Sequence, residues 1–315
     1  MGRSNKLSKR EFDAIIKDNL IAAGVTKDSF GYRTDNDRTY YDYYTEAEFK
    51  RFVDEMKADY AEHYKKYYGD EEAKENRGGL GGELLPKRGR WGMLPPKMAS
   101  VASSSRFCYL ALRDGTDALI SNRILTRDDV EFEKECRIFA DRSTAPQLDA
   151  FIKDTLCDYY VEAKCHEIFD SHEIEFKHKY WEIFQNDKSF CHVLKDAIKH
   201  TDTFEIPKAV FELWGEHMRF DVKQLVCHLF GIANQARGRQ SKLIYLFFKP
   251  KSEDPETALR IEVVFEELKN EIEFIFGSDV IKGFCAYNQI GLEVIVQECN
   301  VMKKLDTYNS RKVFS

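Results

Sequence analysis

Apolar and aromatic residues recur at spacings of three and four in the first part of the chain, a pattern typical of one face of an amphipathic helix. The recurring positions are Phe49, Phe52, Val53, Met56, Tyr60, Tyr64 and Tyr67. Thr45 followed by Glu48 fits a capping box at the start of this helix. We therefore expect residues 1–75 to form a helical N-terminal extension whose aromatic face packs against a core. The alternatives are that this face stacks nucleic-acid bases or recruits a partner protein.

Glycine and proline interrupt this pattern over residues 76–97. The interruption contains Gly78, Gly79, Gly81 and Gly82, followed by Pro86, Pro95 and Pro96. Residues of these two types break both helix and strand periodicity. We expect a long irregular loop here, joining the extension to a main domain over residues 98–315.

Helical and strand-like segments alternate through the main domain. The predicted elements are helix 98–112, strands 130–139, 147–153 and 159–166, helical segments 173–199 and 207–236, strand 243–248, helix 255–276 and strands 282–287 and 291–298. This order favours an α/β fold, with a mixed central sheet flanked by helices.

The composition allows a sizeable core and leaves little net charge for binding nucleic acid. Hydrophobic residues make up 43% and charged residues 32%, which excludes an intrinsically disordered chain. The net charge is −6, so any grip on nucleic acid must come from a local positive region. The clearest such region is a basic run in and after the loop. The alternative is a solvated basic loop that contacts nothing. We expect five residues of this run to contact DNA phosphates: Lys87, Arg88, Arg90, Lys97 and Arg106.

No targeting or membrane segment is expected from the pattern. The N-terminal residues are charged, and the longest apolar run, Leu243 to Phe248, is far shorter than a membrane span. The eight cysteines include no Cys-x-x-Cys pair, so we expect reduced, mostly buried thiols. These features favour a cytoplasmic protein that does not associate with a membrane.

Two acids and a lysine form the sharpest cluster of chemically active residues. Side chains at i and i+2 share one face of a strand, so Glu162 and Lys164 point the same way. If the strand that carries Asp149 pairs with theirs through the turn at 154–158, Asp149 approaches Glu162. Two close carboxylates repel unless a cation lies between them, and hard oxygen ligands suit Mg²⁺ or Mn²⁺. Such an ion activates water and stabilises charge during phosphodiester hydrolysis.

This arrangement, Asp149 followed by the strand sequence Tyr160-Val-Glu-Ala-Lys-Cys-His-Glu167, resembles the PD-(D/E)XK nuclease superfamily and bacterial restriction endonucleases within it. The resemblance covers roughly residues 98–300 and implies a restriction-endonuclease-like core. It implies that Asp149 and Glu162 bind the metal and that Lys164 is catalytic. It also implies a further acid on the preceding strand, Glu133 in preference to Glu135, and a catalytic Gln224 on the following helix.

Other interpretations of these residues are weaker. Lys164 could bridge Asp149 and Glu162 as a structural ion cluster without metal. Structural zinc at Cys165, His166, His172, His178, Cys191 and His192 is disfavoured because the ligand spacings are too long. A cysteine hydrolase would need Cys165 or Cys227 beside His228. The chain has no P-loop, dinucleotide-binding or serine-hydrolase motif.

The sequence therefore predicts a Mg²⁺- or Mn²⁺-dependent endodeoxyribonuclease of restriction type with no organic cofactor. Its expected substrate is double-stranded DNA, and cleavage of both strands favours a homodimer. The main alternative is a non-catalytic nucleic-acid-binding protein of the same fold.

Overall fold

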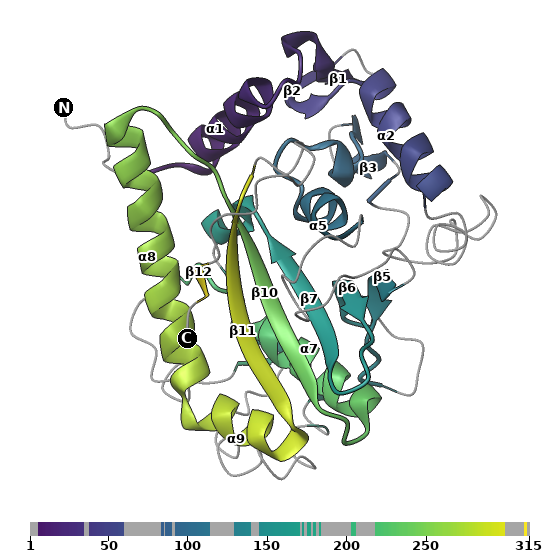
Figure 1. Ribbon diagram of the computed structural model, residues 1–315, viewed down its shortest axis with the longest axis vertical. Coiled ribbons are helices and arrows are strands. Elements are labelled where there is room, and N and C mark those ends of the chain that lie inside the picture. Colours follow the sequence, from purple (N-terminus) through teal and green to yellow (C-terminus); the bar gives the residue numbers. More distant parts are fainter. Residues whose placement is uncertain are drawn as a thin grey trace.

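A computed structural model gives the architecture of the protein (Figure 1). It describes residues 6–34, 38–59, 83–84, 86–89, 92–113, 129–139, 145–170, 172, 175–177, 179–180, 183, 203–205, 218–299 and 312–313. Several predicted features lie outside these residues: the glycine run, Tyr60, Tyr64, Tyr67, Arg90, His178, Cys191, His192 and most of the predicted helix 173–199.

A mixed six-stranded sheet in the order β12-β11-β10-β7-β6-β5 forms the centre of the molecule. Its strands are β5 (Val130–Glu135), β6 (Gln147–Ile152), β7 (Asp158–Lys164), β10 (Ser241–Lys249), β11 (Ile290–Glu298) and the short β12 (Lys312–Val313). Strands β5, β6 and β7 are antiparallel, whereas β7, β10 and β11 run parallel. The predicted α/β class with a mixed sheet is confirmed.

Helices cover both faces of this sheet. They are α5 (Ser104–Leu112), α7 (Val222–Ala236), α8 (Pro255–Gly277) and α9 (Asp279–Asn288). Successive side chains of β10 point to opposite faces. Phe107 of α5 packs on Phe248, whereas Phe276 of α8 packs on Tyr245, so α5 and α8 lie on opposite faces. Strand β10 is buried on both sides, which explains its continuous apolar sequence.

Helix α7 approaches the end of β5 closely, and a glycine makes this possible. A Cβ atom at Gly231 would lie 2.6 Å from the carbonyl oxygen of Cys136. Gln235 Nε2 then donates to the Glu135 carbonyl at 2.6 Å. These contacts fix the helix that carries Gln224 against the antiparallel part of the sheet.

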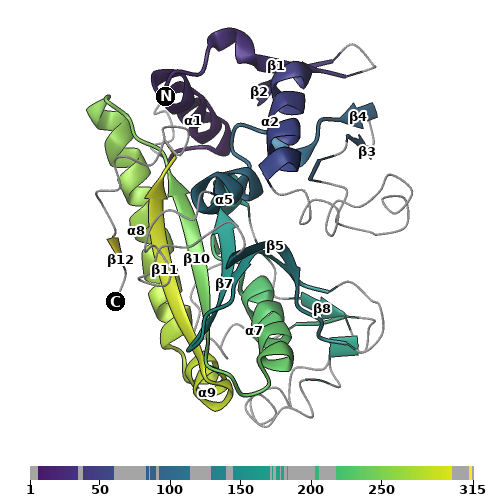
Figure 2. The same ribbon diagram turned by 45° about the vertical axis from the view of Figure 1, so that its right-hand side comes forward.

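The N-terminal region is not wholly helical, contrary to the prediction. Helix α1 (Lys9–Ala22) is followed by the hairpin β1 (Phe30–Arg33) and β2 (Thr39–Tyr44), then by α2 (Glu46–Asp59). Figures 1 and 2 show these elements gathered at one end of the sheet, beside α5. Thr45 accepts from the Glu48 N–H, which is one half of the predicted capping box; the Thr45 N–H donates instead to the Ser29 carbonyl. Phe49, Phe52 and Met56 are buried in the same hydrophobic core as the sheet, which confirms the core-packing interpretation for the described part of the aromatic face.

Four other local predictions were wrong. Residues 282–287 belong to helix α9, because Ser278 caps it and Val280, Ile281 and Phe284 are buried at helical spacing. The helix predicted from 98 begins only at Ser104, where Ser103 accepts from the Arg106 N–H. The loop 76–97 contains the hairpin β3 (Lys87–Gly89) and β4 (Gly92–Leu94). Strand β8 (Glu175–Lys177), which pairs with β9 (Thr203–Glu205), lies within a predicted helix.

The described residues also bear on the membrane and cysteine expectations. Among the described residues, no helix combines the length and apolar composition needed to cross a membrane. All seven cysteines in the described ranges are free thiols, and every one except the half-buried Cys227 is buried.

Candidate active site

Three acidic residues stand at one level on the three adjacent antiparallel strands. The β5–β6 register brings Glu133 opposite Asp149. The β6–β7 register, continued by one position beyond Ala150, brings Asp149 opposite Glu162. The approach of Asp149 to Glu162 expected from a strand pair is therefore present, and Glu133 extends the row.

The strands β6 and β7 separate where these acids lie. Their pairing ends at Ala150 and Val161, one position before the acids. Beyond this point the Asp149 carboxylate replaces the missing backbone partner: its Oδ2 accepts from the Ala163 N–H at 2.7 Å. Its Oδ1 accepts from the Ser105 hydroxyl at 3.0 Å. Asp149 is thus held by both the neighbouring strand and helix α5.

Glu162 lies in a compact polar cluster. Its Oε1 accepts from Lys164 Nζ at 2.7 Å and from Gln224 Nε2 at 2.8 Å. Its Oε2 lies 3.7 Å from His228 Nε2. Burial raises the pKa of Glu162, and Lys164 partly offsets this. Burial alone would lower the pKa of Lys164, but the Glu162 and Glu167 carboxylates raise it far above its usual range, so Lys164 stays protonated.

The backbone of Glu133 is strained. Its φ of 52° is in the left-handed region, which a non-glycine residue adopts at a cost of about 1–3 kcal/mol. This conformation interrupts the β5–β6 pairing at Glu133. Glu133 as a whole residue is 8% exposed, and no donor among the described residues hydrogen-bonds to its carboxylate.

Burial and mutual repulsion disfavour the charged form of the acids in this row, although Lys97 and Lys164 partly offset the repulsion. Burial and the Asp149 carboxylate raise the pKa of Glu133 well above its usual range, with Glu83 and Glu162 adding to the shift. Burial and the Glu162 carboxylate likewise raise the pKa of Asp149 well above its usual range, although the hydrogen bond from the Ala163 N–H lowers it. Like charges held together in this way favour either protonation or a bound cation.

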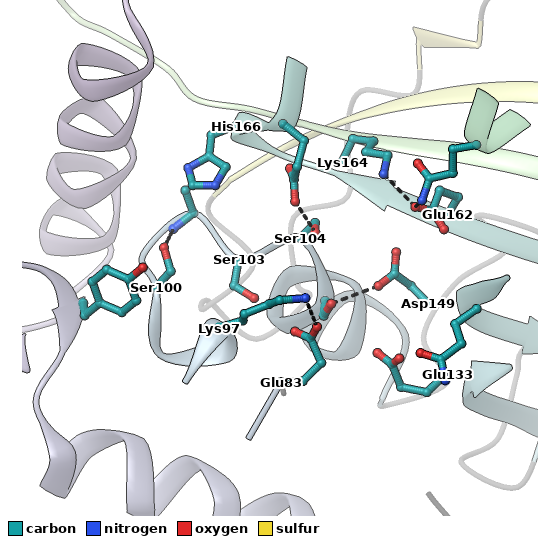
Figure 3. A pocket seen from close by; sticks show the side chains of 16 residues that line it. Glu83, Lys97, Ser100, Ser103, Ser104, Glu133, Asp149, Glu162, Lys164 and His166 are labelled. Carbon is teal, nitrogen blue, oxygen red and sulfur yellow. Dashed lines mark hydrogen bonds and ion pairs between the residues drawn. The ribbon is translucent and has the colours of Figure 1, made fainter. Parts of the chain in front are cut away.

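These side chains line a cavity of about 330 Å³ between α5, β7 and the N-terminal elements. Figure 3 shows Asp149 and Glu133 pointing into one space, with the Glu162–Lys164 pair on one side and the Glu83–Lys97 pair on the other. Gln224 also lines the cavity, at the first turn of α7. The structure therefore brings together Glu133, Asp149, Glu162, Lys164 and Gln224.

The donor chemistry of this cavity fits Mg²⁺ or Mn²⁺. Mg²⁺ is typically held by one or two carboxylates and keeps several waters, and Asp149, Glu162 and Glu133 supply such oxygens. Within the described ranges, no three His, Cys, Asp or Glu side chains are grouped closely enough to enclose a metal ion.

The predicted DNA-contacting residues are dispersed. Arg88 is exposed on β3, whereas Lys97 lies at the cavity, with its Nζ 2.7 Å from Glu83 Oε1. Lys87 belongs to β3 but its side chain is outside the description, as is all of Arg90.

Arg106 does not belong with the exposed cations. It is 6% exposed, and its guanidinium carbon lies 3.9 Å from the centre of the Tyr44 ring and 4.2 Å from that of Phe52. Arg106 therefore joins α5 to the N-terminal elements inside the core, and it cannot reach a phosphate without unpacking. The apolar residues that follow it, Phe107 to Leu112, were the sequence signal for this burial.

Some side chains that line the cavity have contacts that the sequence did not indicate. Ser104 donates to Glu167 at 2.7 Å and Ser105 holds Asp149. His166 contacts Asp13 from helix α1 at 2.8 Å. The serine cluster was visible in the sequence, but nothing there linked Asp13 to His166.

The competing cysteine chemistry does not fit the structure. Burial raises the pKa of Cys165 well above its usual range and that of Cys227 to about 11. A nucleophilic cysteine needs the opposite shift, because the thiolate is the reactive form.

Comparison with known proteins found no matching family model, no matching curated protein and no matching solved structure.

Proposed function

We propose that this protein is a Mg²⁺- or Mn²⁺-dependent endodeoxyribonuclease that hydrolyses phosphodiester bonds of double-stranded DNA. The observation that carries the proposal is the row of Glu133, Asp149 and Glu162 at the separation of β6 and β7, with Lys164 bound to Glu162. Strained backbone, raised carboxyl pKa values and strand separation all meet at one cavity, as is common at functional sites.

The order of elements supports the resemblance to a restriction-endonuclease-like core. Helix α5 is followed by the antiparallel strands β5, β6 and β7, then by α7 and the parallel strand β10. The acids of the proposed PD-(D/E)XK motif lie on β6 and β7, and Gln224 lies on α7. This is the arrangement that the resemblance implies for Asp149, Glu162, Lys164 and Gln224.

Each residue has a proposed role in the reaction. Asp149 and Glu162, with Glu133, would hold the metal, which supplies charge neutralisation at the phosphate and lowers the pKa of water. Lys164, kept protonated by its carboxylate neighbours, would stabilise negative charge that develops on the phosphate oxygens. Gln224 orients the Glu162 carboxylate through its hydrogen bond.

The DNA contacts and the assembly are also proposals. The exposed Arg88 and the loop residues Lys87 and Arg90 would contact the backbone outside the cavity, while Lys97 would approach the phosphate nearest to it. A homodimer would allow cleavage of both strands. Gel filtration of the protein with bound DNA tests this, and a pure monomer would contradict it.

A plasmid-cleavage assay with Mg²⁺, Mn²⁺ or EDTA tests the activity directly. Asp149→Asn should lower the cleavage rate by about 10²–10³-fold, since a metal ion stabilises the transition state by several kcal/mol. Glu131→Gln is the matched control, because Glu131 lies on β5 but is paired with Lys134 away from the cavity. DNA binding without cleavage in any metal would instead support the non-catalytic alternative.

A further inference from the structure

A histidine–aspartate pair stands at the edge of the cavity. His166 is the first residue of the short 3-10 helix η4 (His166–Phe169), directly after the strand that ends at Lys164. Its Nδ1 lies 2.8 Å from Oδ1 of Asp13 in helix α1, 153 residues away in the chain. The His166 and Asp13 side chains are 24% and 14% exposed, and His166 lines the cavity.

Independent contacts fix helix α1 in this position. Lys9 Nζ lies 2.8 Å from Asp170 Oδ1, just beyond η4. The ring of Phe12 packs on that of Phe169, with 4.9 Å between centroids. Arg260 of α8 lies 3.1 Å from Glu11, next to the capping box that starts α1. Asp13 is therefore held by a docked helix and does not meet His166 by chance at a flexible end.

The pair leaves one ring nitrogen of His166 able to accept a proton. A carboxylate only accepts hydrogen bonds when ionised, so Nδ1 carries the ring proton and Nε2 bears a lone pair. No other described residue hydrogen-bonds to the ring. The geometry is that of a base oriented by a carboxylate, which also stabilises the imidazolium that forms on protonation.

Other side chains that line the cavity are poorly suited to accept this proton. Lys164 and Lys97 are held protonated by neighbouring carboxylates. Both oxygens of Asp149 and Oε1 of Glu162 accept hydrogen bonds, and these two residues are the proposed metal-binding groups. Tyr43 from β2 and the buried Cys165 interact electrostatically with Asp13, and Lys164 from β7 and Glu167 on η4 line the cavity with His166. Imidazole is the side-chain type that exchanges protons near neutral pH.

We propose that His166 is the general base of the hydrolysis and that Asp13 is its positioning residue; this rests on the proposed nuclease function. In the step, a water oxygen forms a bond to phosphorus while its proton moves to Nε2 of His166. The bond between phosphorus and the leaving oxygen breaks, and that oxygen keeps the electron pair and takes a proton from solvent. The imidazolium then returns its proton to solvent.

The proposal gives the N-terminal helix a role in the active site. Removal of residues 1–75 would take away Asp13 together with the aromatic residues that pack on α5. We therefore expect such a truncation to lose cleavage and not to yield a working nuclease core.

Single-turnover plasmid cleavage by the full chain in Mg²⁺ tests the pair. His166→Gln and Asp13→Asn should each lower the rate by about 10²–10⁴-fold, as expected for loss of a general base or of its correct tautomer. Asp170→Asn is the matched control: it breaks the Lys9–Asp170 pair between α1 and the residue after η4 but leaves His166 and Asp13 intact, so its rate should stay close to wild type.

Nitrogen NMR of the EDTA-treated protein provides a readout that does not depend on activity. The wild-type His166 ring should carry its proton on Nδ1, and Asp13→Asn should move it to Nε2, because an amide donates to Nδ1. A wild-type ring protonated only on Nε2, or a His166→Gln variant that cleaves at the wild-type rate, would overturn the proposal. An equal loss of rate in Asp170→Asn would also overturn it, by assigning the effect to helix docking. If the wild type cleaves no DNA, the nuclease function itself fails, while the ring-nitrogen result still decides whether the pair exists.

Discussion

The carboxylate of Asp149 accepts a hydrogen bond from the backbone N–H of Ala163 at 2.7 Å, at the point where β6 and β7 stop pairing. A side chain thus satisfies a backbone donor that the separating strands leave unpaired. The same separation opens the cavity beside Glu162. The proposed activity therefore depends on a local interruption of the sheet that the acid itself stabilises.

Glu133→Gln should stabilise the metal-free protein. The pKa of Glu133 is raised on folding by burial and by Asp149, so the folded state binds the extra proton and stability falls as pH rises above the unfolded value near 4.5. The gain in melting temperature should therefore be larger at about pH 8 than at about pH 5, roughly 2–4 °C for each kcal/mol relieved. Thermal unfolding in EDTA measures this. Glu135→Gln is the control, because Glu135 is 38% exposed and paired with Arg137; a stabilised Glu135→Gln and an unchanged Glu133→Gln would contradict the repulsion.

Gln224→Ala should reduce cleavage more than stability. Loss of its bond to Glu162 frees this buried carboxylate, the proposed metal ligand, to turn, and losses of about 10–100-fold are usual for partners of metal ligands. The unfolding free energy should fall by about 0.5–1.5 kcal/mol. Gln235→Ala on the same helix breaks a comparable bond to the Glu135 carbonyl, away from the cavity. It should lose similar stability and keep its cleavage rate, and equal rates in the two variants would rule out an orienting role for Gln224.

Arg106→Gln should reduce thermal stability, whereas Arg88→Gln should reduce the salt dependence of DNA binding. Arg106 is buried against Tyr44 and Phe52, and desolvated contacts of this kind contribute about 2 kcal/mol, so its loss should lower the melting temperature. DNA affinity per folded molecule should keep its salt dependence. Arg88 is exposed, so its loss should leave the melting temperature unchanged and reduce the slope of log affinity against log salt by about 1. A weaker salt slope in Arg106→Gln would return Arg106 to the DNA-contacting set.

His228 should make the metal-free protein sensitive to acid. Burial and the charge of Lys164 lower the pKa of His228 from 6.5 to about 3, so between these values the unfolded chain binds more protons and stability falls as pH falls. This contribution reaches about 1.4 kcal/mol per pH unit. The raised pKa values of Glu133, Asp149 and Glu162 oppose it, so it is the difference in slope between the wild type and His228→Gln. Urea unfolding in EDTA across this range measures the slope.

His172 has the opposite shift, because its bond to Asp221 raises its pKa. Its stabilising effect is present at acid pH and is lost as pH rises. His172→Gln should therefore make the protein more sensitive to acid in the same measurement.

Local features of the fold were accessible from the sequence. The strands at 147–152 and 158–164, the buried strand β10 and helix α8 follow from apolar periodicity and length. Helix α9 was misread as a strand because its short apolar segment fits both periods, and only the Ser278 cap and its packing decide for the helix. The β1–β2 hairpin was missed because its tyrosines are spaced like those of a half-buried helix.

The candidate site was predictable where its residues share a motif. The register expected for a strand pair brings Asp149 to Glu162, and Glu133 follows from the next strand. The strained φ of Glu133 and the aromatic partners of Arg106 were not predictable, since both depend on which neighbours pack against them.

The sequence by itself determined the strand pair, its turn and the spacing of Glu162 and Lys164, because these depend on contacts between residues that are close along the chain. The tertiary structure alone decided that Asp13 meets His166, that Ser105 holds Asp149 and that Gln224 reaches Glu162. Each of these contacts closes a long loop, and only the packing of whole helices on the sheet offsets the loss of chain entropy on closure.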